Sequence, residues 1–144
     1  MSPQIERARL DDLSAVAGLL AACGLPTEDI GEHFDHFLVA RSDGALCAAG
    51  GLEFHGAHAL LRSVAVQPAW RGIGAARAVC QGLLAAARQR GCSRVYLLTT
   101  TAESFFVHLG FKRVARDALP AEIRATREFT ELCPQTAIAM MIEP

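Results

Sequence analysis

The stretch Arg71-Gly72-Ile73-Gly74 contains the residue types in this sequence that are best suited to binding a ligand. It follows an apolar run, residues 59–66, that predicts a strand, and it opens an Ala- and Leu-rich run, residues 74–90, that predicts a long helix. Glycines allow backbone N–H groups to come close to a ligand, and the first turn of a helix has N–H groups with no partner inside the helix. This order of elements indicates a site for a phosphate or pyrophosphate, and Arg71 can add a charge-assisted contact.

Two widespread phosphate-binding loops do not fit this stretch. The sequence has no G-x-x-x-x-G-K-[ST] pattern, which excludes a P-loop. It also has no G-x-G-x-x-G pattern with an acidic residue about 20 positions further on, which a dinucleotide-binding unit requires. An ordinary strand-to-helix turn that needs two glycines for its geometry remains an alternative, because short glycine motifs are weak signals when they stand alone.

The elements around this stretch predict a mixed α/β domain. Strands are expected at residues 4–8, 34–40, 45–54, 59–66, 95–98, 111–114 and 136–142. Helices are expected at residues 10–23 and 74–90, a further short one opens with a Thr100-x-x-Glu103 capping box and ends at Gly110, and residues 119–132 are irregular or partly helical. Short turns join the second, third and fourth strands, so we expect these three to form an antiparallel meander.

Size, composition and charge limit the class of protein. With 144 residues, 51% of them hydrophobic and 20% charged, the chain fits one globular domain over residues 1–144. The formal net charge of -1 favours neither nucleic acid nor an acidic membrane as a partner. No apolar run is long enough for a membrane span, and the pair Asp11–Asp12 falls where a signal peptide needs its apolar stretch, so we expect a cytoplasmic protein.

Five cysteines are spread widely along the sequence, and none belongs to a C-x-x-C pair. An odd number at such spacing fits neither a disulfide framework nor a zinc site. We therefore expect the cysteines to be small buried side chains in a reducing compartment, and we expect no bound metal.

Two motifs give the whole chain a resemblance to a known superfamily. The stretch SVAVQPAWRGIGAA, residues 63–76, resembles the [QR]-x-x-G-x-[GA] element of the GNAT superfamily of acetyl-CoA-dependent N-acyltransferases, with Arg71, Gly74 and Ala76 at the matching positions. The stretch AESFFVHLGF, residues 102–111, resembles the later helix of that family, which ends in L-G-F. The two motifs come in the expected order and at the expected separation.

The resemblance implies a GNAT fold, an α/β (α+β) arrangement with a mixed, mostly antiparallel sheet of six to seven strands flanked by helices. It also implies that acetyl-CoA is the cosubstrate. In that family the pyrophosphate lies on the loop before the long helix and the pantetheine arm lies beside the preceding strand. Carried over, the cofactor-binding residues are Val64, Ala65, Val66, Arg71, Gly72, Ile73, Gly74, Ala75, Ala76 and Phe106.

The implied reaction is direct attack of an amine on the thioester, which requires a neutral amine and stabilisation of an oxyanion. The family uses backbone amides of the strand before the loop for the oxyanion, which points to Val64 or its neighbour. Glu53 is our candidate base or amine-binding carboxylate, with a solvated charge at a strand end as the alternative. His55 and His58 are weaker candidates for the base, since exposed loop histidines are the simpler interpretation.

One position departs from the superfamily pattern. Many members have a tyrosine in the later helix that is thought to protonate the leaving thiolate, whereas the matching position here holds Phe106. Phenylalanine has no proton to give, so the thiolate leaves unassisted or receives a proton from water or from another group. Tyr96 is the only tyrosine, and its position in a predicted strand indicates core packing.

The acceptor is indicated by weaker similarities. Residues 96–106 resemble the corresponding stretch of N-acetylglutamate synthase domains, and residues 117–137 resemble small acetyltransferases encoded with bacterial arsenic-resistance genes. Both imply a small amino-acid-like acceptor, of which an arsenic-containing amino acid is one example. Arginine binds carboxylates in a fork, and a solvated basic edge is the alternative for each arginine. The candidate acceptor-binding residues are Arg62, Thr99, Arg124 and Arg127, the last two expected on one helix face.

The leading hypothesis is an acetyl-CoA-dependent N-acetyltransferase that acts on a small amine. A protein or peptide N-acetyltransferase of the same fold is one alternative. A catalytically weak acetyl-CoA-binding regulatory module is another, and Phe106 is the residue that favours it. A homodimer is an open alternative for the assembly state.

Overall fold

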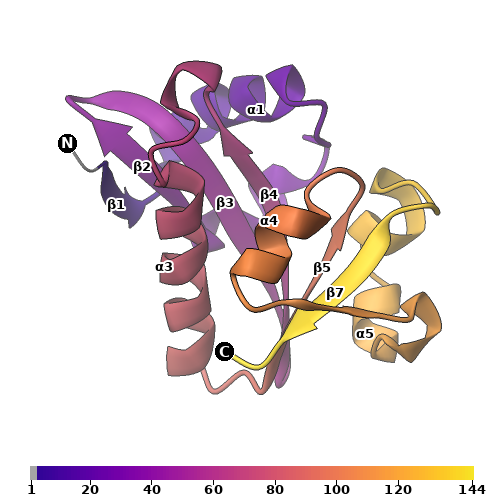
Figure 1. The fold of residues 1–144 in the computed structure, drawn as a ribbon. Helices are drawn as coiled ribbons and strands as arrows, with labels where there is room; N and C mark the ends of the chain where they lie inside the picture. The colour runs from indigo at the N-terminus through magenta and orange to yellow at the C-terminus, as the bar shows by residue number, and fades with distance from the viewer. Residues whose placement is uncertain (1–2) are drawn as a thin grey trace. The chain divides into compact units, whose positions relative to one another are not determined.

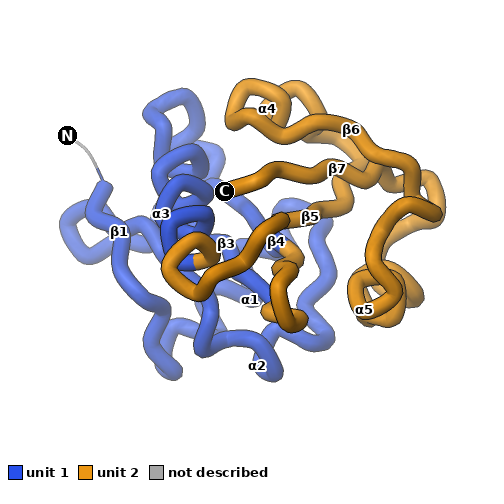
Figure 2. Tube along the Cα trace, turned by 90° about the horizontal axis from the view of Figure 1, so that it is seen from below, with its two compact units in different colours: residues 1–53, 61–86 blue, residues 54–60, 87–144 orange. Residues whose placement is uncertain are grey.

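The computed structural model describes residues 3–144 of the chain. The chain divides into two compact units, shown in Figure 2. Unit 1 comprises residues 1–53 and 61–86, and unit 2 comprises residues 54–60 and 87–144. That all 144 residues act as one domain stays a prediction. Within the described residues, no helix combines the length and the apolar character needed to cross a bilayer.

Seven strands form one mixed open sheet in the order β1-β2-β3-β4-β5-β7-β6, which confirms the predicted mixed sheet (Figure 1). The strands are β1 (Gln4–Arg7), β2 (Phe37–Ser42), β3 (Ala45–His55), β4 (His58–Val66), β5 (Arg94–Thr99), β6 (Lys112–Val114) and β7 (Ile138–Ile142). The α-helices are α1 (Leu13–Ala22), α2 (Ile30–His33), α3 (Ala75–Gln89), α4 (Glu103–His108) and α5 (Ala121–Arg124). Strands β1, β2 and β3 pair antiparallel in sequence order, and β4 lies next to β3 in the sheet.

The core of unit 1 lies between α1, the α2 segment and the first strands. Val16, Leu19 and Leu20 recur at helical spacing on α1 and are buried with Phe37 of β2. Helix α1 ends at Ala22, and Gly24, two residues further on, has a φ of 73°, in the left-handed region that closes a helix. These contacts hold the segment after α1 against the sheet.

Helix α3 packs closely on β3 because Gly50 has no side chain. A Cβ atom at Gly50 would lie 3.0 Å from a Val79 methyl group and 3.1 Å from a Leu83 methyl group. Val79 and Leu83 are fully buried, as the predicted apolar face of the helix requires. The part of α3 that contains Val79 and Leu83 is therefore held against the sheet of unit 1.

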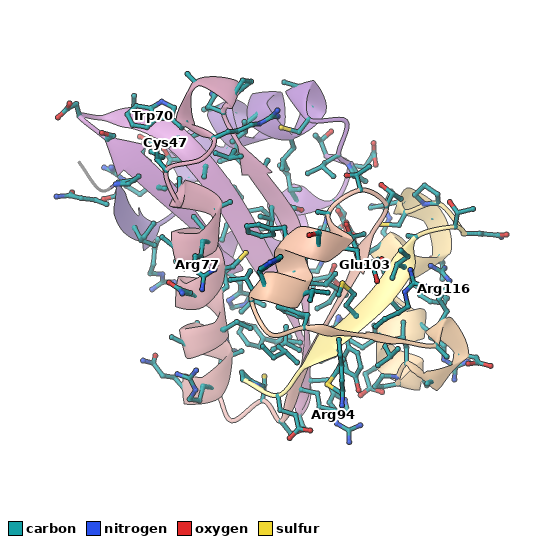
Figure 3. All side chains as sticks on the ribbon, in the orientation of Figure 1. Cys47, Trp70, Arg77, Arg94, Glu103 and Arg116 are labelled. Atoms are coloured by element: carbon teal, nitrogen blue, oxygen red, sulfur yellow. The ribbon has the colours of Figure 1, made fainter. Side chains whose placement is uncertain are left out.

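Unit 2 is built on the strands that follow the long helix. The first residues of β4, His58–Leu60, pair parallel with Arg94–Tyr96 of β5. Strand β7 pairs antiparallel with both β5 and β6. Tyr96 is buried with Ile123 and Met141, so its predicted role in core packing is confirmed. Arg116, labelled in Figure 3, donates to the carbonyl of Ala137 at 2.8 Å and fastens the segment before β7.

Two expected elements are corrected. The strand predicted at residues 34–40 begins at Phe37, because Phe34 continues the buried face of the helical segment that contains Ile30. The predicted Thr100-x-x-Glu103 capping box does not form, and the hydroxyl of Thr99 instead accepts from the amide of Ala102 at 3.1 Å. The Glu103 carboxylate, labelled in Figure 3, receives two bonds of 3.0 Å from Arg113.

Candidate active site

The predicted phosphate loop connects β4 to α3 through one 3-10 turn, Pro68–Trp70. Gly72 and Gly74 have φ values of 84° and 85°, which L residues rarely adopt. A Cβ atom on either glycine would meet no other atom within 4 Å. The backbone conformation itself therefore requires these two glycines, and the space beside them is open to a ligand.

The charge around the start of α3 suits an anion. The loop from Arg71 to Gly74 is exposed, and Ile73 keeps 46% of its surface accessible. The first turn of α3 contains no acidic residue but does contain Arg77, which Figure 3 labels on that helix. A basic side chain is unfavourable at the positive end of a helix dipole unless an anion is near. The amide of Arg71 donates to the carbonyl of Pro68 at 3.3 Å. The charge-assisted contact expected from the Arg71 side chain stays a prediction.

Strand β4 contains a local break in its pleat. Ser63 has a φ of 59°, an uncommon value for a residue other than glycine in the middle of a strand. Such backbone outliers are frequent at functional sites. The peptide group that follows belongs to Val64, the residue predicted to bind the oxyanion. Nothing in the sequence SVAV indicates this break.

A buried network of charged side chains lies beside this break, in unit 1. The guanidinium of Arg62 donates to both oxygens of Asp29, at 2.7 and 2.5 Å, and to Oε2 of Glu53 at 2.6 Å. Its Nε atom donates to the hydroxyl of Ser63 at 3.1 Å. Asp29 precedes α2, Glu53 lies on β3 and Arg62 lies on β4, so three separate segments meet at one guanidinium.

The burial of this network decides between the two interpretations of Glu53. Glu53 keeps only 3% of its surface accessible, so the alternative of a solvated strand-end charge is wrong. Burying a charge is costly unless it is paired and hydrogen-bonded, and Arg62 provides both. One arginine faces two carboxylates here, so the three ionised groups carry one excess negative charge.

His33 is the exposed member of the cluster, and its role was not predicted from the sequence. Its Nε2 atom lies 3.6 Å from Oε1 of Glu53 and 3.8 Å from Oδ2 of Asp29. The His33 side chain retains 24% of its accessible surface, whereas Asp29 and Arg62 are buried. His33 and Asp29 are four residues apart across one helical turn, but no local pattern links them to Glu53.

The same atoms could serve as metal ligands. One ligand atom each from Asp29, His33 and Glu53 lies within 4.8 Å of the others. However, the guanidinium of Arg62 is already bonded to both carboxylates, and a cation placed there would face its positive charge. The arrangement is therefore better described as an ion-pair network than as a metal centre.

The role predicted for Arg62 is corrected. We expected its guanidinium to bind the carboxylate of an acceptor, but in the structure it binds two carboxylates of the chain, and its side chain is fully buried. Its fork geometry is used inside the protein, where it holds Glu53 in place.

The other predicted acceptor residues lie in unit 2. Arg124 ends α5 and donates to the carbonyl of Leu119 at 3.0 Å, and Arg127 pairs with Glu131 at 3.0 Å. Because α5 ends at Arg124, the two arginines do not share the face of one helix, which corrects that expectation. Thr99 is buried and bonds within its own turn. Acceptor binding by these residues stays a prediction.

Phe106 and the two histidines predicted as weaker base candidates, His55 and His58, lie in different surroundings. Phe106 is buried, with its ring centroid 5.1 Å from that of Phe105 and 5.6 Å from that of Phe111. His58 lies 2.7 Å from Glu122, and this hydrogen bond lowers the pKa of the Glu122 carboxyl. His58 therefore lies at the start of β4 and His55 at the end of β3, so neither lies in an exposed loop.

Comparison with known proteins gives three similarities. A curated but uncharacterized N-acetyltransferase of Chlorobaculum tepidum is 28% identical over 127 residues, which cover 83% of this chain and 81% of that protein. The Mycobacterium tuberculosis protein Rv2747, solved in complex with CoA and NLQ, is 25% identical with a TM-score of 0.84, and 99% of each chain is covered. N-acetylglutamate synthase from Neisseria gonorrhoeae, complexed with coenzyme A and N-acetyl-glutamate, has a TM-score of 0.86 at 20% identity, which concerns the fold alone. This chain spans 35% of that synthase.

The family of this chain is established by a family model that matches its central region. The model of the acetyltransferase (GNAT) family matches residues 11–111, well over half of the 144 residues. The matched region includes both sequence motifs, the loop before α3 and all four members of the buried network. The chain therefore belongs to the GNAT family of acetyltransferases, and it is an N-acetyltransferase with acetyl-CoA as its acyl donor.

Proposed function

We propose that the chain transfers the acetyl group of acetyl-CoA to the amine of a small, amino-acid-like acceptor by direct attack on the thioester. The observation that carries this proposal is the loop before α3, where Gly72 and Gly74 have positive φ and face open space. Such a backbone, together with the first turn of a helix, presents N–H groups to an anion. The pyrophosphate of acetyl-CoA is an anion of suitable charge for this loop.

We assign the pantetheine arm to the backbone of Val64, Ala65 and Val66. The paired residues of β4 and β5 are His58–Leu60 and Arg94–Tyr96, so residues 64–66 lie beyond that ladder. A strand segment outside a ladder can bind an extended ligand through its main chain. The break at Ser63 reorients the next peptide group, and we assign the amide of Val64 to the oxyanion.

We propose that Glu53 accepts the proton that the attacking amine must lose. An amine with a pKa of about 8 to 10 is mostly protonated at neutral pH, so attack requires a proton acceptor. Glu53 is an ionisable group on β3, one strand away from the break at Ser63. The excess negative charge of its network with Asp29 and Arg62 also favours an ammonium group. Glu53 therefore acts as the base, directly or through a water molecule, or as the anchor of the amine.

The amino-acid character of the acceptor rests on similarity. Residues 96–106 resemble N-acetylglutamate synthase domains, and the synthase of similar fold was solved with N-acetyl-glutamate. Arg124 and Arg127, both exposed, are the arginines we retain as partners for the acceptor's carboxylate, with Thr99 as a hydroxyl donor. The similarity of residues 117–137 to enzymes encoded with arsenic-resistance genes adds arseno-amino acids to the candidates.

The test is a screen of acceptors with acetyl-CoA, measured as release of free thiol. The panel contains free amino acids, glutamate analogues, phosphono- and arseno-amino acids, and peptides with free N-termini. We expect turnover of one class of free amino acid, with kcat/KM at least tenfold above that for peptides. A preference for peptides would favour a peptide N-acetyltransferase. Tight binding of acetyl-CoA without thiol release over the whole panel would favour a regulatory module.

A further inference from the structure

His33 occupies a position between the buried carboxylates and solvent. Its Nε2 atom lies 3.6 Å from Oε1 of Glu53, while Oε2 of the same carboxylate accepts from Arg62 at 2.6 Å. The two oxygens of Glu53 thus face different partners. A separation of 3.6 Å is an ion-pair distance rather than a hydrogen bond, and a small rotation of the imidazole or one water molecule would close it.

The sequence around His33 fixes the imidazole in this place. Ile30 and Phe34, on either side of it, are buried in the core of unit 1 and anchor the short α2 segment. Asp29 occupies the position before α2 where an aspartate usually caps the helix, but its side chain makes no cap bond. Its two oxygens bind Arg62 instead, so the same guanidinium holds the α2 segment and Glu53.

The chemistry of the reaction requires a route for protons. The acceptor enters as an ammonium ion, its nitrogen forms a bond to the carbonyl carbon, and the bond from that carbon to sulfur breaks. Two protons leave the nitrogen, one of them balances the thiolate that is released as a thiol, and one net proton passes to solvent. A carboxylate that is only 3% exposed needs a neighbour to pass on the proton that it accepts.

We propose that His33 is the proton relay of this enzyme: the neutral imidazole takes from Glu53 the proton that Glu53 has taken from the acceptor amine and passes it to solvent. This inference rests on the proposed function, in which Glu53 is the base. His33 acts through Glu53 rather than on the substrate, so it is a positioning and proton-transfer residue. The ion pair between Asp29 and Arg62 holds His33 and Glu53 at fixed positions relative to each other.

The pH dependence follows from the charges that face His33. They are Asp29 before α2, Glu32 on α2 at 3.9 Å, Glu53 on β3 and, through the two buried carboxylates, Arg62 on β4. Near and below neutral pH nearly all of the acceptor amine carries its extra proton, so every turnover depends on the relay. At high pH the amine loses its proton to solvent without help, so the relay should matter less.

The first experiment compares pH profiles of kcat for the wild type and His33→Gln, with the best acceptor of the screen. At pH 7 we expect kcat of His33→Gln to be lower by roughly 10²-fold, the lower end of what a positioned acid–base group contributes. The loss should shrink to a few-fold above about pH 9, with the KM for acetyl-CoA unchanged. His36→Gln, the same substitution three residues further on, is the matched control and should keep the wild-type profile.

The second experiment uses His33→Ala, which leaves room for a small base. Imidazole added to the buffer should restore at least tenfold of the lost kcat in this variant and should not change the wild type. An unaltered pH profile in folded His33→Gln, or no rescue of folded His33→Ala, would overturn the relay while leaving the proposed function intact. Absence of turnover by the wild type with every acceptor would overturn the proposed function, and the relay with it.

Discussion

The loop before α3 and the buried network around Arg62 are two parts of unit 1 that are built in opposite ways. The loop is a continuous stretch, Gln67–Ala76, whose residues from Arg71 to Gly74 are exposed and whose useful groups belong to the backbone. The network joins Asp29, His33, Glu53 and Arg62 from distant points of the chain, and its useful groups are side chains, three of them buried.

The difference predicts how each part fails when it is changed. A loop that works through backbone amides depends on φ and tolerates most side chains that keep it. A buried network depends on the balance of charge, and removing one partner leaves another charge unpaired in a poorly solvated place. Substitutions in the loop should therefore affect ligand affinity, and substitutions in the network should affect turnover and stability.

The largest effect is expected for Gly74→Val, because a β-branched residue cannot readily adopt a φ of 85°. The loop must change course, and its amides would no longer reach the phosphates that we assign to this loop. Losing three hydrogen bonds to a charged group, at about 1.5–3 kcal/mol each, would lower affinity for acetyl-CoA by more than about 10³-fold. Calorimetric titration with acetyl-CoA measures this.

Gly44→Val is the matched control for this experiment. Gly44 also has a positive φ, 79°, and also faces open space, but it lies in the turn between β2 and β3. Both variants should lose a similar amount of thermal stability, and only Gly74→Val should lose affinity. Equal affinities for acetyl-CoA in the two folded variants would contradict the assignment of its phosphates to this loop.

Glu53→Gln should lower the rate by roughly 10²–10⁴-fold if Glu53 is the base, because the amide keeps the size but cannot accept a proton. The loss should shrink at high pH, where the amine is already neutral. If Glu53 only anchors an ammonium group, KM for the acceptor should rise with little change in kcat. Glu28→Gln, at an exposed carboxylate that the network does not include, is the control. Wild-type kinetics in Glu53→Gln would show that Glu53 is neither the base nor the anchor of the amine.

The same contrast explains how much could be predicted from the sequence. The glycine turn between β4 and α3 could be predicted because its residues are consecutive in the sequence, and the buried face of α3 could be predicted from the spacing of its apolar residues. That this loop binds phosphates stays a prediction. The burial of Glu53 and the use of Arg62 inside the protein could not be predicted, because they depend on where Asp29 falls after folding. The positive φ of Ser63 was missed because serine carries no signal for it, unlike Gly72 and Gly74.

Asp29→Asn should destabilise the protein by about 3 kcal/mol, the lower end for a broken buried pair, since Arg62 keeps its bond to Glu53. The rate should fall as well, because the α2 segment, which contains His33, loses the ion pair between Asp29 and Arg62. Denaturant unfolding and kcat measure the two effects. A variant that keeps both wild-type values would show that the network does not hold the site.

Asp12→Asn tests a more exposed arginine pair and should have a smaller effect. Burial raises the pKa of the Asp12 carboxyl, but hydrogen bonds from the Arg9 amide and from Arg41 outweigh burial and leave the pKa lowered. A lowered pKa means that the ionised carboxyl stabilises the fold above the ordinary aspartate value, near 3.9, and that this contribution is lost as the pH falls through the lowered value. The difference in Tm between Asp12→Asn and the wild type should therefore be largest near neutral pH and should vanish in strong acid. A difference in Tm that stays constant with pH would show that the difference comes from packing rather than from the charge of Asp12.

The smallest effect on turnover is expected for Phe106→Tyr. If protons reach the thiolate by another route, a phenol at this position should change kcat by less than about tenfold, roughly 1.4 kcal/mol of barrier. The ring is buried between Phe105 and Phe111, so an added hydroxyl without a partner should lower Tm. Phe105→Tyr, at the less buried neighbour, is the matched control and should cost less stability. A gain in kcat well above tenfold in Phe106→Tyr alone would show that the wild-type site lacks an acid, and it would contradict an independent proton route to the thiolate.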